Sequence, residues 1–271
     1  MTAAPTDEDR VTIAFDGGVA DVRLNRPDKL NALDPAMFAG IEAALARLAA
    51  MPGLRAVVLS GEGRAFCAGL DMASMASGGA SAALGGGADL TQRTHGPANI
   101  FQHVAWGWRA LPVPVIAAVS GIAFGGGCQI MSGADIRIAR PDARLSIMEM
   151  KWGLVPDMAG IALWRTLVRD DVLRELTYTA REFSGAEGQT LGFVTRLADD
   201  PHAEAMALAR AIAARNPEAM RAAKRLYNAA AGDPEPLLVA ESVEQAGVIR
   251  RPNQVEAVMA NMQKRAPVFA D

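Results

Sequence analysis

The chain has 271 residues, 51% of them hydrophobic, and a formal net charge of −3. This much apolar material is enough for a large buried core, and the weakly acidic balance argues against a nucleic-acid or anionic-membrane surface. The opening MTAAPTDEDR lacks a secretory signal pattern, and no run approaches the roughly 20 apolar residues of a membrane span. We therefore expect a cytoplasmic protein.

Signals for metal binding and disulfides are weak. The chain contains Cys67 and Cys128 without a C-x-x-C arrangement, and its three histidines, His95, His103 and His202, are far apart in sequence. Zinc sites usually show closely spaced ligands, and disulfide frameworks show several cysteines. The sequence therefore predicts neither a disulfide nor a metal site.

Strand and helix signals alternate along the first half of the chain. Residues 11–25 are typical of a hairpin around Asp16-Gly17-Gly18, and Asp34 followed by Pro35 predicts the start of a helix of about four turns. Alternation of this kind favours an α/β layer structure. Four further apolar runs predict strands, at 55–60, 115–119, 136–139 and 143–147.

The second half is predominantly helical. Ser184-Gly185-Ala186-Glu187 has the spacing of a capping box, Gly192 ends the short helix, and residues 193–197 predict a small strand. Residues 202–265 predict three more helices. We place a boundary near residue 200, which divides the chain into an α/β core, 1–200, and a helical C-terminal region, 201–271.

Segment 73–88 differs from the rest because it consists almost entirely of Ala, Ser, Gly and Met. It has no hydrophobic periodicity and almost no charge. This composition predicts a mobile loop.

Two segments rich in small residues each follow a predicted strand. GEGRAFCAGLD (61–71) is compatible with a tight turn or with close approach of a ligand to backbone N–H groups around Ala68. It is not a dinucleotide fingerprint, because Phe66 stands where the third glycine belongs. GIAFGGGC (121–128) puts three glycines at a predicted helix start, where unpaired N–H groups attract negative charge, although close helix–strand packing is an alternative.

Two acids follow in SIMEMKWGLVPDMAG (146–160). Glu149 lies in apolar surroundings, where a carboxyl group tends to have a raised pKa and can transfer protons near neutral pH. Asp157 can do the same, or it can simply cap a helix that begins at Met158.

Taken together, these segments resemble the crotonase superfamily, also called the enoyl-CoA hydratase/isomerase family. The resemblance covers nearly the whole chain and is weakest in 73–100. It is carried by LNRPDKLNAL (24–33), GRAFCAGLDM (63–72), VPVIAAVSGIAFGGGC (113–128), FSGAEGQTLGFV (183–194) and the ending QKRAPVFAD.

The resemblance implies a ββα superhelix, in which 1–200 is the acyl-CoA-binding catalytic core and 201–271 a helical trimerisation region of a homotrimer or hexamer. It implies an oxyanion hole formed by the N–H groups of Ala68 and Gly126, with Glu149 and Asp157 as the catalytic acids. No metal and no cofactor beyond the coenzyme A of the substrate is expected. The substrate-binding candidates are Arg26, Lys29, Arg64, Ala65, Gly69, Gly125 and Gln129.

The reaction depends on the acids. Typical hydratases of the family have glutamates at the positions that match Gln129 and Glu149, whereas here Gln129 can position a water but cannot exchange protons with it. Carboxylates at 149 and 157 resemble the dienoyl-CoA isomerases, so we expect an enoyl- or dienoyl-CoA double-bond isomerase, with an enoyl-CoA hydratase as the alternative. The superfamily also contains RNA-binding homologues and weakly catalytic acyl-CoA binders; the absence of a basic tract and the two acids argue against these.

Overall fold

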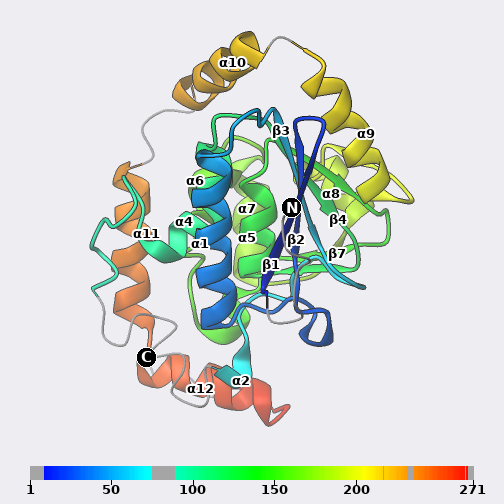
Figure 1. Cartoon of the computed structure of the whole chain (residues 1–271). Coiled ribbons are helices and arrows are strands. Elements are labelled where there is room, and N and C mark those ends of the chain that lie inside the picture. The colour runs from blue at the N-terminus through cyan, green and yellow to red at the C-terminus, as the bar shows by residue number, and fades with distance from the viewer. Residues whose placement is uncertain (1–8, 75–88, 216, 231–234, 266, 268–271) are drawn as a thin grey trace.

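The computed structural model describes residues 9–74, 89–215, 217–230, 235–265 and 267. Strands and helices alternate through the first 200 residues, and helices follow (Figure 1). The strands are β1 (Val11–Asp16), β2 (Val19–Leu24), β3 (Ala56–Gly61), β4 (Val115–Val119), β5 (Ile122–Phe124), β6 (Ile136–Ala139), β7 (Arg144–Ser146), β8 (Phe183–Ser184) and β9 (Arg196–Leu197). The helices are η1 (Pro27–Lys29), α1 (Pro35–Ala49), α2 (Met72–Ser74), α4 (Ile100–Ala110), α5 (Gly126–Ser132), η3 (Glu149–Trp152), α6 (Gly160–Trp164), α7 (Asp170–Thr179), α8 (Gly185–Leu191), α9 (Pro201–Ala213), α10 (Pro217–Ala230), α11 (Glu235–Val248) and α12 (Pro252–Met262).

The strands form two sheets. The larger has the order β1-β2-β3-β4-β6-β9, in which only the β1–β2 hairpin is antiparallel. The smaller has the order β5-β7-β8. Because β3 and β4 are parallel, with Val57 opposite Val115, the segments that leave their carboxyl ends emerge at the same edge of the sheet.

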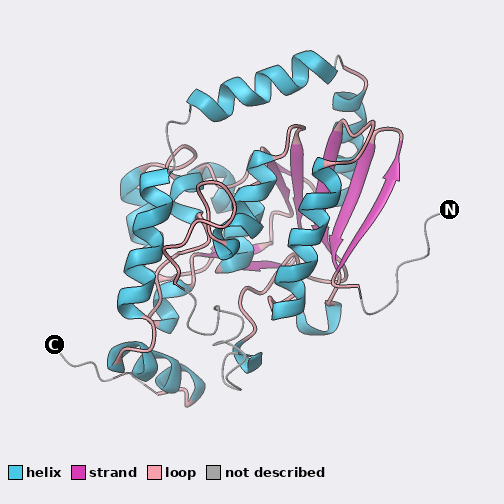
Figure 2. Cartoon of the chain, turned by 60° about the vertical axis from the view of Figure 1, so that its left-hand side comes forward, coloured by secondary structure: helices cyan, strands magenta, loops and turns pink. Residues whose placement is uncertain are grey.

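The central strands β3 and β4 of the larger sheet are buried on both faces, which explains why they are continuous apolar runs. On one face α9 contributes Ala205, Ala209 and Ala213, whose small side chains allow close packing on Val58 and Ile116. The other face is covered by α1, α4 and α5 (Figures 1 and 2). The remaining C-terminal helices α10, α11 and α12 run around the outside of this core (Figure 1).

Most elements agree with the sequence predictions. Asp34 caps α1 by accepting a hydrogen bond from Met37 N at 2.7 Å, and Ser184 caps α8 in the same way through Glu187 N at 3.0 Å. The hairpin and the four apolar strands are confirmed, with bounds that differ by at most one residue.

Three predictions need correction or have no counterpart. The strand expected over 193–197 is limited to Arg196–Leu197. The described part of the C-terminal region contains four helices, α9 to α12, instead of the three predicted, because new helices begin at Pro217, Glu235 and Pro252. The predicted mobile loop 73–88 lies outside the described residues except for its first two positions.

None of the helices in the described part of the chain combines the length and apolar character that a bilayer crossing requires.

An ion-pair network joins the first loop to the segment after β3. The Arg26 guanidinium lies 2.6 Å from Asp71 and 3.4 Å from Asp34, and these three side chains are only 10–13% exposed. Asp34 also pairs with Arg10 at 3.1 Å. Arg26 therefore fixes the start of α1 against the loop that carries Asp71.

Replacing Arg26 with Met should destabilise the fold by about 2–3 kcal/mol, because it leaves two half-buried carboxylates with less compensation. Urea unfolding followed by circular dichroism measures this loss. The matched control is Lys29→Met, which removes an exposed cation from the same loop and should change the free energy of unfolding by less than about 0.5 kcal/mol. Equal losses in the two variants would contradict the assignment.

Candidate active site

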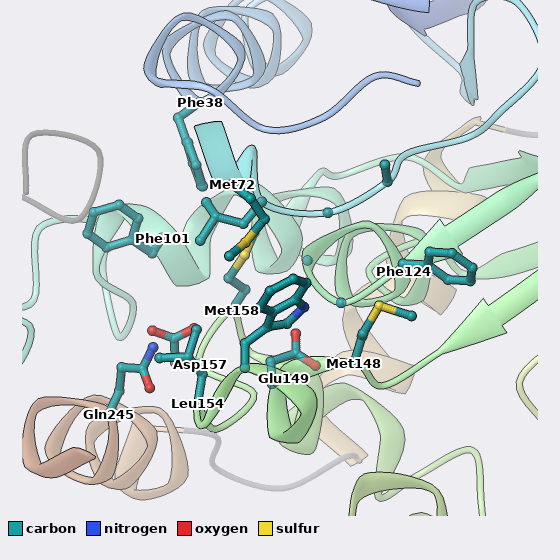
Figure 3. Close-up of a pocket in the computed structure, with 16 residues that line it drawn as sticks. Phe38, Met72, Phe101, Phe124, Met148, Glu149, Leu154, Asp157, Met158 and Gln245 are labelled. Atoms are coloured by element: carbon teal, nitrogen blue, oxygen red, sulfur yellow. The ribbon is translucent and has the colours of Figure 1, made fainter. Parts of the chain in front are cut away.

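Six chain segments line a cavity of about 120 Å³ at the edge where β3 and β4 end. Figure 3 shows its acidic side chains on one wall and its aromatic and methionine side chains around them. The lining residues are Phe38, Ala68, Gly69, Leu70, Met72, Phe101, Phe124, Gly125, Gly126, Met148, Glu149, Trp152, Leu154, Asp157, Met158 and Gln245.

Two backbone N–H groups are unpaired at this cavity. Among the described residues, neither Leu70 N nor Gly126 N has a hydrogen-bond partner, and both residues line the cavity. Gly126 is the first residue of α5, where a free N–H and the helix dipole favour a negatively charged oxygen. The cavity therefore offers two backbone donors to a ligand oxygen.

The prediction that Ala68 supplies one of these donors is wrong. Ala68 N donates to Leu30 O at 2.9 Å, so its hydrogen is used by the first loop. Along the same segment, the carbonyl of Gly69 and the N–H of Asp71 both pair with Leu33, which leaves the N–H of Leu70 pointing away from that ladder. The alternation of a strand-like segment thus moves the free donor two residues further on.

Glycine is required at both segments for steric reasons. Gly69 and Gly125 have φ of +83° and +50°, in the region that side-chain-bearing residues avoid. A Cβ on Gly69 would lie 2.5 Å from Phe124 O, so the two segments touch through their backbones. Asn31 fixes the first of them, because its buried Nδ2 donates to Ala65 O at 2.8 Å and to Glu62 O at 3.0 Å.

Glu149 is the first acid of the site. It begins η3, is 8% exposed, and accepts a hydrogen bond from Gln129 Nε2 to its Oε1 at 2.7 Å. Its Oε2 is buried and has no hydrogen-bond partner in the described part of the chain. Burial raises the pKa of Glu149 from 4.5 to about 7, only partly opposed by hydrogen bonds to its carboxylate.

Gln129 does not belong to the lining of the cavity, contrary to the prediction that it binds substrate. Its side chain is fully buried, and its Oε1 accepts hydrogen bonds from Met158 N and Gly160 N, each at 2.9 Å. Every polar group of the amide is therefore used to hold Glu149 and the 158–160 turn in place.

Asp157, the second acid, lines the same cavity and does not cap a helix. The next helix, α6, starts only at Gly160, and its N-cap is Ala159 in a left-handed conformation with no side-chain cap. Burial, followed by the charge of Glu149, raises the pKa of Asp157 from 3.8 to about 7. The helix-cap alternative is thereby excluded.

Gln245 was not anticipated from the sequence. It comes from α11, is 2% exposed, and lines the cavity beside Asp157 (Figure 3). Its side-chain hydrogen bond to Asp157 lowers the pKa of that acid, and its Oε1 accepts from Val155 N at 3.3 Å. A glutamine in a helical C-terminal pattern carries no signal of this role, because only the tertiary fold brings α11 to the site.

The aromatic and methionine side chains that form the apolar wall of the cavity were not predicted from the sequence either. Phe38 of α1 and Phe101 of α4 pack edge to face with ring centroids 5.5 Å apart, and Met72, Met148 and Met158 fill the remaining space. In the sequence Phe38 and Phe101 are ordinary core positions of two helices. Their contribution to a cavity depends on how the helices pack.

The predicted cationic residues separate into two groups. Lys29 and Arg64 are exposed, and within the described chain neither forms an ion pair. Arg26 is different, because its guanidinium pairs with Asp34 and Asp71, so its positive charge is largely compensated within the protein. Ala65 is buried behind the loop and is absent from the cavity lining given above, whereas Gly69 and Gly125 belong to it.

The family model described as enoyl-CoA hydratase/isomerase matches residues 14–271. The chain belongs to the enoyl-CoA hydratase/isomerase family. This confirms the resemblance to the crotonase superfamily and, with it, an enzyme family that acts on acyl-CoA thioesters.

Relatives within the enoyl-CoA hydratase/isomerase family differ in the reaction their names give. A probable enoyl-CoA hydratase of Mycobacterium bovis is 32% identical over 96% of this chain and 97% of its own length. A peroxisomal Delta(3,5)-Delta(2,4)-dienoyl-CoA isomerase of Arabidopsis thaliana is 29% identical, with 94% of each chain covered.

Solved structures of the family share the fold. An enoyl-CoA hydratase/isomerase from Mycobacterium paratuberculosis has a TM-score of 0.80 at 26% identity, covering 93% of this chain and 98% of that one. A carnitinyl-CoA hydratase from Mycobacterium avium has a TM-score of 0.82 at 26% identity, covering 96% and 98%. The α/β crotonase fold is therefore confirmed.

The raised pKa of Glu149 in this family member has a consequence for stability. The folded protein binds the Glu149 proton more tightly than the unfolded chain does, so ionisation destabilises the fold progressively as pH rises from about 4.5 through about 7. Glu149→Gln removes this titration. The variant should therefore gain about 2 kcal/mol more relative to wild type at pH 8 than at pH 5.

Urea unfolding at the two pH values measures the difference. Glu182→Gln is the control, because Glu182 is exposed and paired with Arg144 at the surface, and its effect should change by less than about 0.5 kcal/mol between the same pH values. A Glu149→Gln effect that is independent of pH would contradict the raised pKa.

Proposed function

We propose that this protein is a double-bond isomerase acting on enoyl- or dienoyl-CoA thioesters. The observation that carries the proposal is the pair of protonatable carboxyl groups, Glu149 and Asp157, in one cavity with two unpaired N–H groups. A pKa near 7 lets each acid take up or release a proton at physiological pH. The name of the dienoyl-CoA isomerase relative supports the same reaction.

The chemistry begins with the thioester carbonyl oxygen at Leu70 N and Gly126 N. One carboxylate removes a proton from the carbon next to the carbonyl, and the electron pair spreads onto the oxygen as an enolate. Each backbone donor aimed at that oxygen contributes on the order of 3 kcal/mol. A carboxylic acid then returns a proton to the far end of the conjugated system, so the double bond moves and no atom is gained or lost.

The positions of Glu149 and Asp157 suggest which acid removes the proton beside the carbonyl and which returns a proton to the distant carbon. Glu149 Oε1 lies 3.3 Å from where a Cβ on Gly125 would be, so Glu149 is adjacent to the oxyanion segment and suits the carbon beside the carbonyl. Asp157 lies on the α11 side of the cavity, beside Gln245, and suits the more distant carbon (Figure 3). Gln129 supports isomerisation indirectly, because its amide leaves no second carboxylate beside Glu149 for activating water.

Hydration of 2-enoyl-CoA is the second candidate. It is favoured by the unpartnered Oε2 of Glu149, a buried acceptor that suits a water molecule, and by the hydratase name of the Mycobacterium bovis relative. In that case Glu149 alone would activate the water, and Asp157 would be dispensable for the chemistry.

A panel of 2-enoyl-, 3-enoyl- and 3,5-dienoyl-CoA thioesters distinguishes the two reactions. If the protein is an isomerase, Glu149→Gln and Asp157→Asn should each lower kcat for double-bond migration by about 10²- to 10³-fold, because each removes a proton-transfer group. Binding of the thioester should survive in both variants. Migration and hydration are followed separately by absorbance and by product chromatography.

Asp142→Asn serves as the control, since Asp142 is exposed and pairs only with Arg140 at 2.9 Å within the described structure; it should leave kcat unchanged. Fast hydration of 2-enoyl-CoA by the wild type, together with an active Asp157→Asn variant, would refute the isomerase and establish the hydratase.

The coenzyme A phosphates are proposed to lie near Lys29 and Arg64. These exposed cations lie on two loops that touch, because a Cβ on Gly63 would be 2.9 Å from Pro27 Cβ. A chain of net charge −3 needs such local positive charge to bind a polyanion.

Lys29→Ala and Arg64→Ala should each raise KM for the thioester about fivefold and leave kcat within about twofold, which is the pattern of binding lost equally from ground and transition states. Steady-state kinetics at low ionic strength measure both constants. Arg47→Ala, an exposed cation in the last turn of α1, is the control and should change neither. An unchanged KM in both variants would remove these two residues from the phosphate site.

Assembly as a homotrimer or hexamer is part of the proposal. Two large side chains of α10 support it, because Leu226 and Tyr227 are 72% and 78% exposed in the single chain. Exposed apolar side chains on one helix are typical of a surface that another subunit covers.

A further inference from the structure

Two of the three histidines, His95 and His103, contact the same carboxylate, that of Glu42. Glu42 of α1 contacts both His95, in the turn before α4, and His103 of α4. Glu42 Oε2 is 2.8 Å from His103 Nδ1 and 3.2 Å from His95 Nε2. The expectation that no metal site exists was based on the separation of the histidines in sequence, and the fold removes that separation.

The spacing of these atoms suits a small divalent ion. The ligand atoms of Glu42, His95 and His103 all lie within 4.8 Å of one another. Ligands held at about 2.0–2.1 Å from a tetrahedral zinc ion are about 3.3 Å apart. The 3.2 Å contact of Glu42 with His95 matches this separation, and the 2.8 Å contact with His103 would lengthen by a small side-chain movement. Two imidazole nitrogens with one carboxylate oxygen are ligands that zinc and neighbouring transition metals accept.

The supporting contacts orient His95. Its other ring nitrogen, Nδ1, lies 2.9 Å from Thr94 Oγ1, which is the kind of outer contact that fixes the ring of a metal-binding histidine. Its backbone is held as well, because His95 N donates to Ala98 O at 2.9 Å and Ala98 N donates back at 3.1 Å. His103 is held by α4, which begins with a complete capping box between Asn99 and Gln102.

The two imidazole rings stack with centroids 4.5 Å apart and an interplanar angle of 22°. His103 Nδ1 lies 2.9 Å from Glu42 Oε1 as well as 2.8 Å from Oε2, so without a metal the neutral rings hold the carboxylate by hydrogen bonds. A divalent ion binds the neutral forms of both rings and the carboxylate together. The three side chains are 17–31% exposed, which leaves space for a water ligand at a fourth position.

We propose that Glu42, His95 and His103 form a binding site for one divalent transition-metal ion, with zinc as the preferred ion. None of the three residues lines the catalytic cavity. The ion would instead fasten the turn that carries His95 to α1 and α4, the helices that supply Phe38 and Phe101 to the apolar wall of that cavity. The site is independent of which reaction the enzyme performs.

Isothermal titration of the full-length, chelator-treated protein with zinc chloride tests the proposal. One ion should bind per chain, and His95→Ala, His103→Ala and Glu42→Gln should each weaken binding at least tenfold. His202→Ala is the matched control, because His202 pairs with Asp21 at 3.0 Å elsewhere on the surface; its affinity should equal that of the wild type.

Thermal unfolding gives a second measurement. Zinc at about 100 times its dissociation constant should raise the Tm of the wild type by about 5 °C and leave the Tm of the double variant His95→Ala/His103→Ala unchanged. A wild-type affinity no greater than that of the double variant, or an equal loss in His202→Ala, would overturn the site.

Discussion

The buried carboxamide of Gln129 is the constraint on which the acidic half of the site depends. It donates to Glu149 and accepts from the backbone of Met158 and Gly160, so a single side chain at the start of α5 fixes two later segments. An amide can do this because it offers a donor and an acceptor at once, whereas a carboxylate at the same position would confront Glu149 with a like charge. Gln129, where this chain departs from the hydratase pattern, therefore serves to position Glu149 and the 158–160 turn.

The half of the cavity that carries the unpaired N–H groups depends on contacts between backbone segments instead of side chains. Parallel pairing of β3 and β4 brings two segments to one edge, and glycines at 69 and 125 let their backbones touch. Asn31 then fixes the first segment through two carbonyls. Because the donors are N–H groups, their positions are set by hydrogen-bond alternation, and the sequence letters at those positions reveal little.

This difference explains what could be predicted from the sequence. Local signals predicted well: Asp34 and Ser184 cap their helices, the apolar runs are strands, and the compound motif identified the family. Assignments that depend on pairing across the fold were less accurate. The sequence points to Ala68, whereas Leu70 carries the free N–H, and the letters around Arg26 do not reveal its ion pairs with Asp34 and Asp71.

Contacts between distant segments left no local signal at all. Gln245 reaches Asp157 from a helix almost 90 residues later in the chain. The hydrogen bond that Gln245 accepts from Val155 N holds its side chain at this position. His95 and His103 stack only because the turn at 95–98 folds back on α4. Such pairs are set by packing, and a single sequence does not encode them in any short pattern.

The apolar wall links the chemistry to the stability of the fold. The same methionine and aromatic side chains that shape the cavity remove water from Glu149 and Asp157, and this burial is the largest cause of both raised pKa values. Holding the pKa values of the two acids near 7 costs folding free energy at neutral pH, because an ionised Glu149 has an oxygen with no partner in the described structure. A more polar wall would stabilise the carboxylates and lower their pKa values. The raised pKa values of the two acids and the local instability of the site thus have one physical origin.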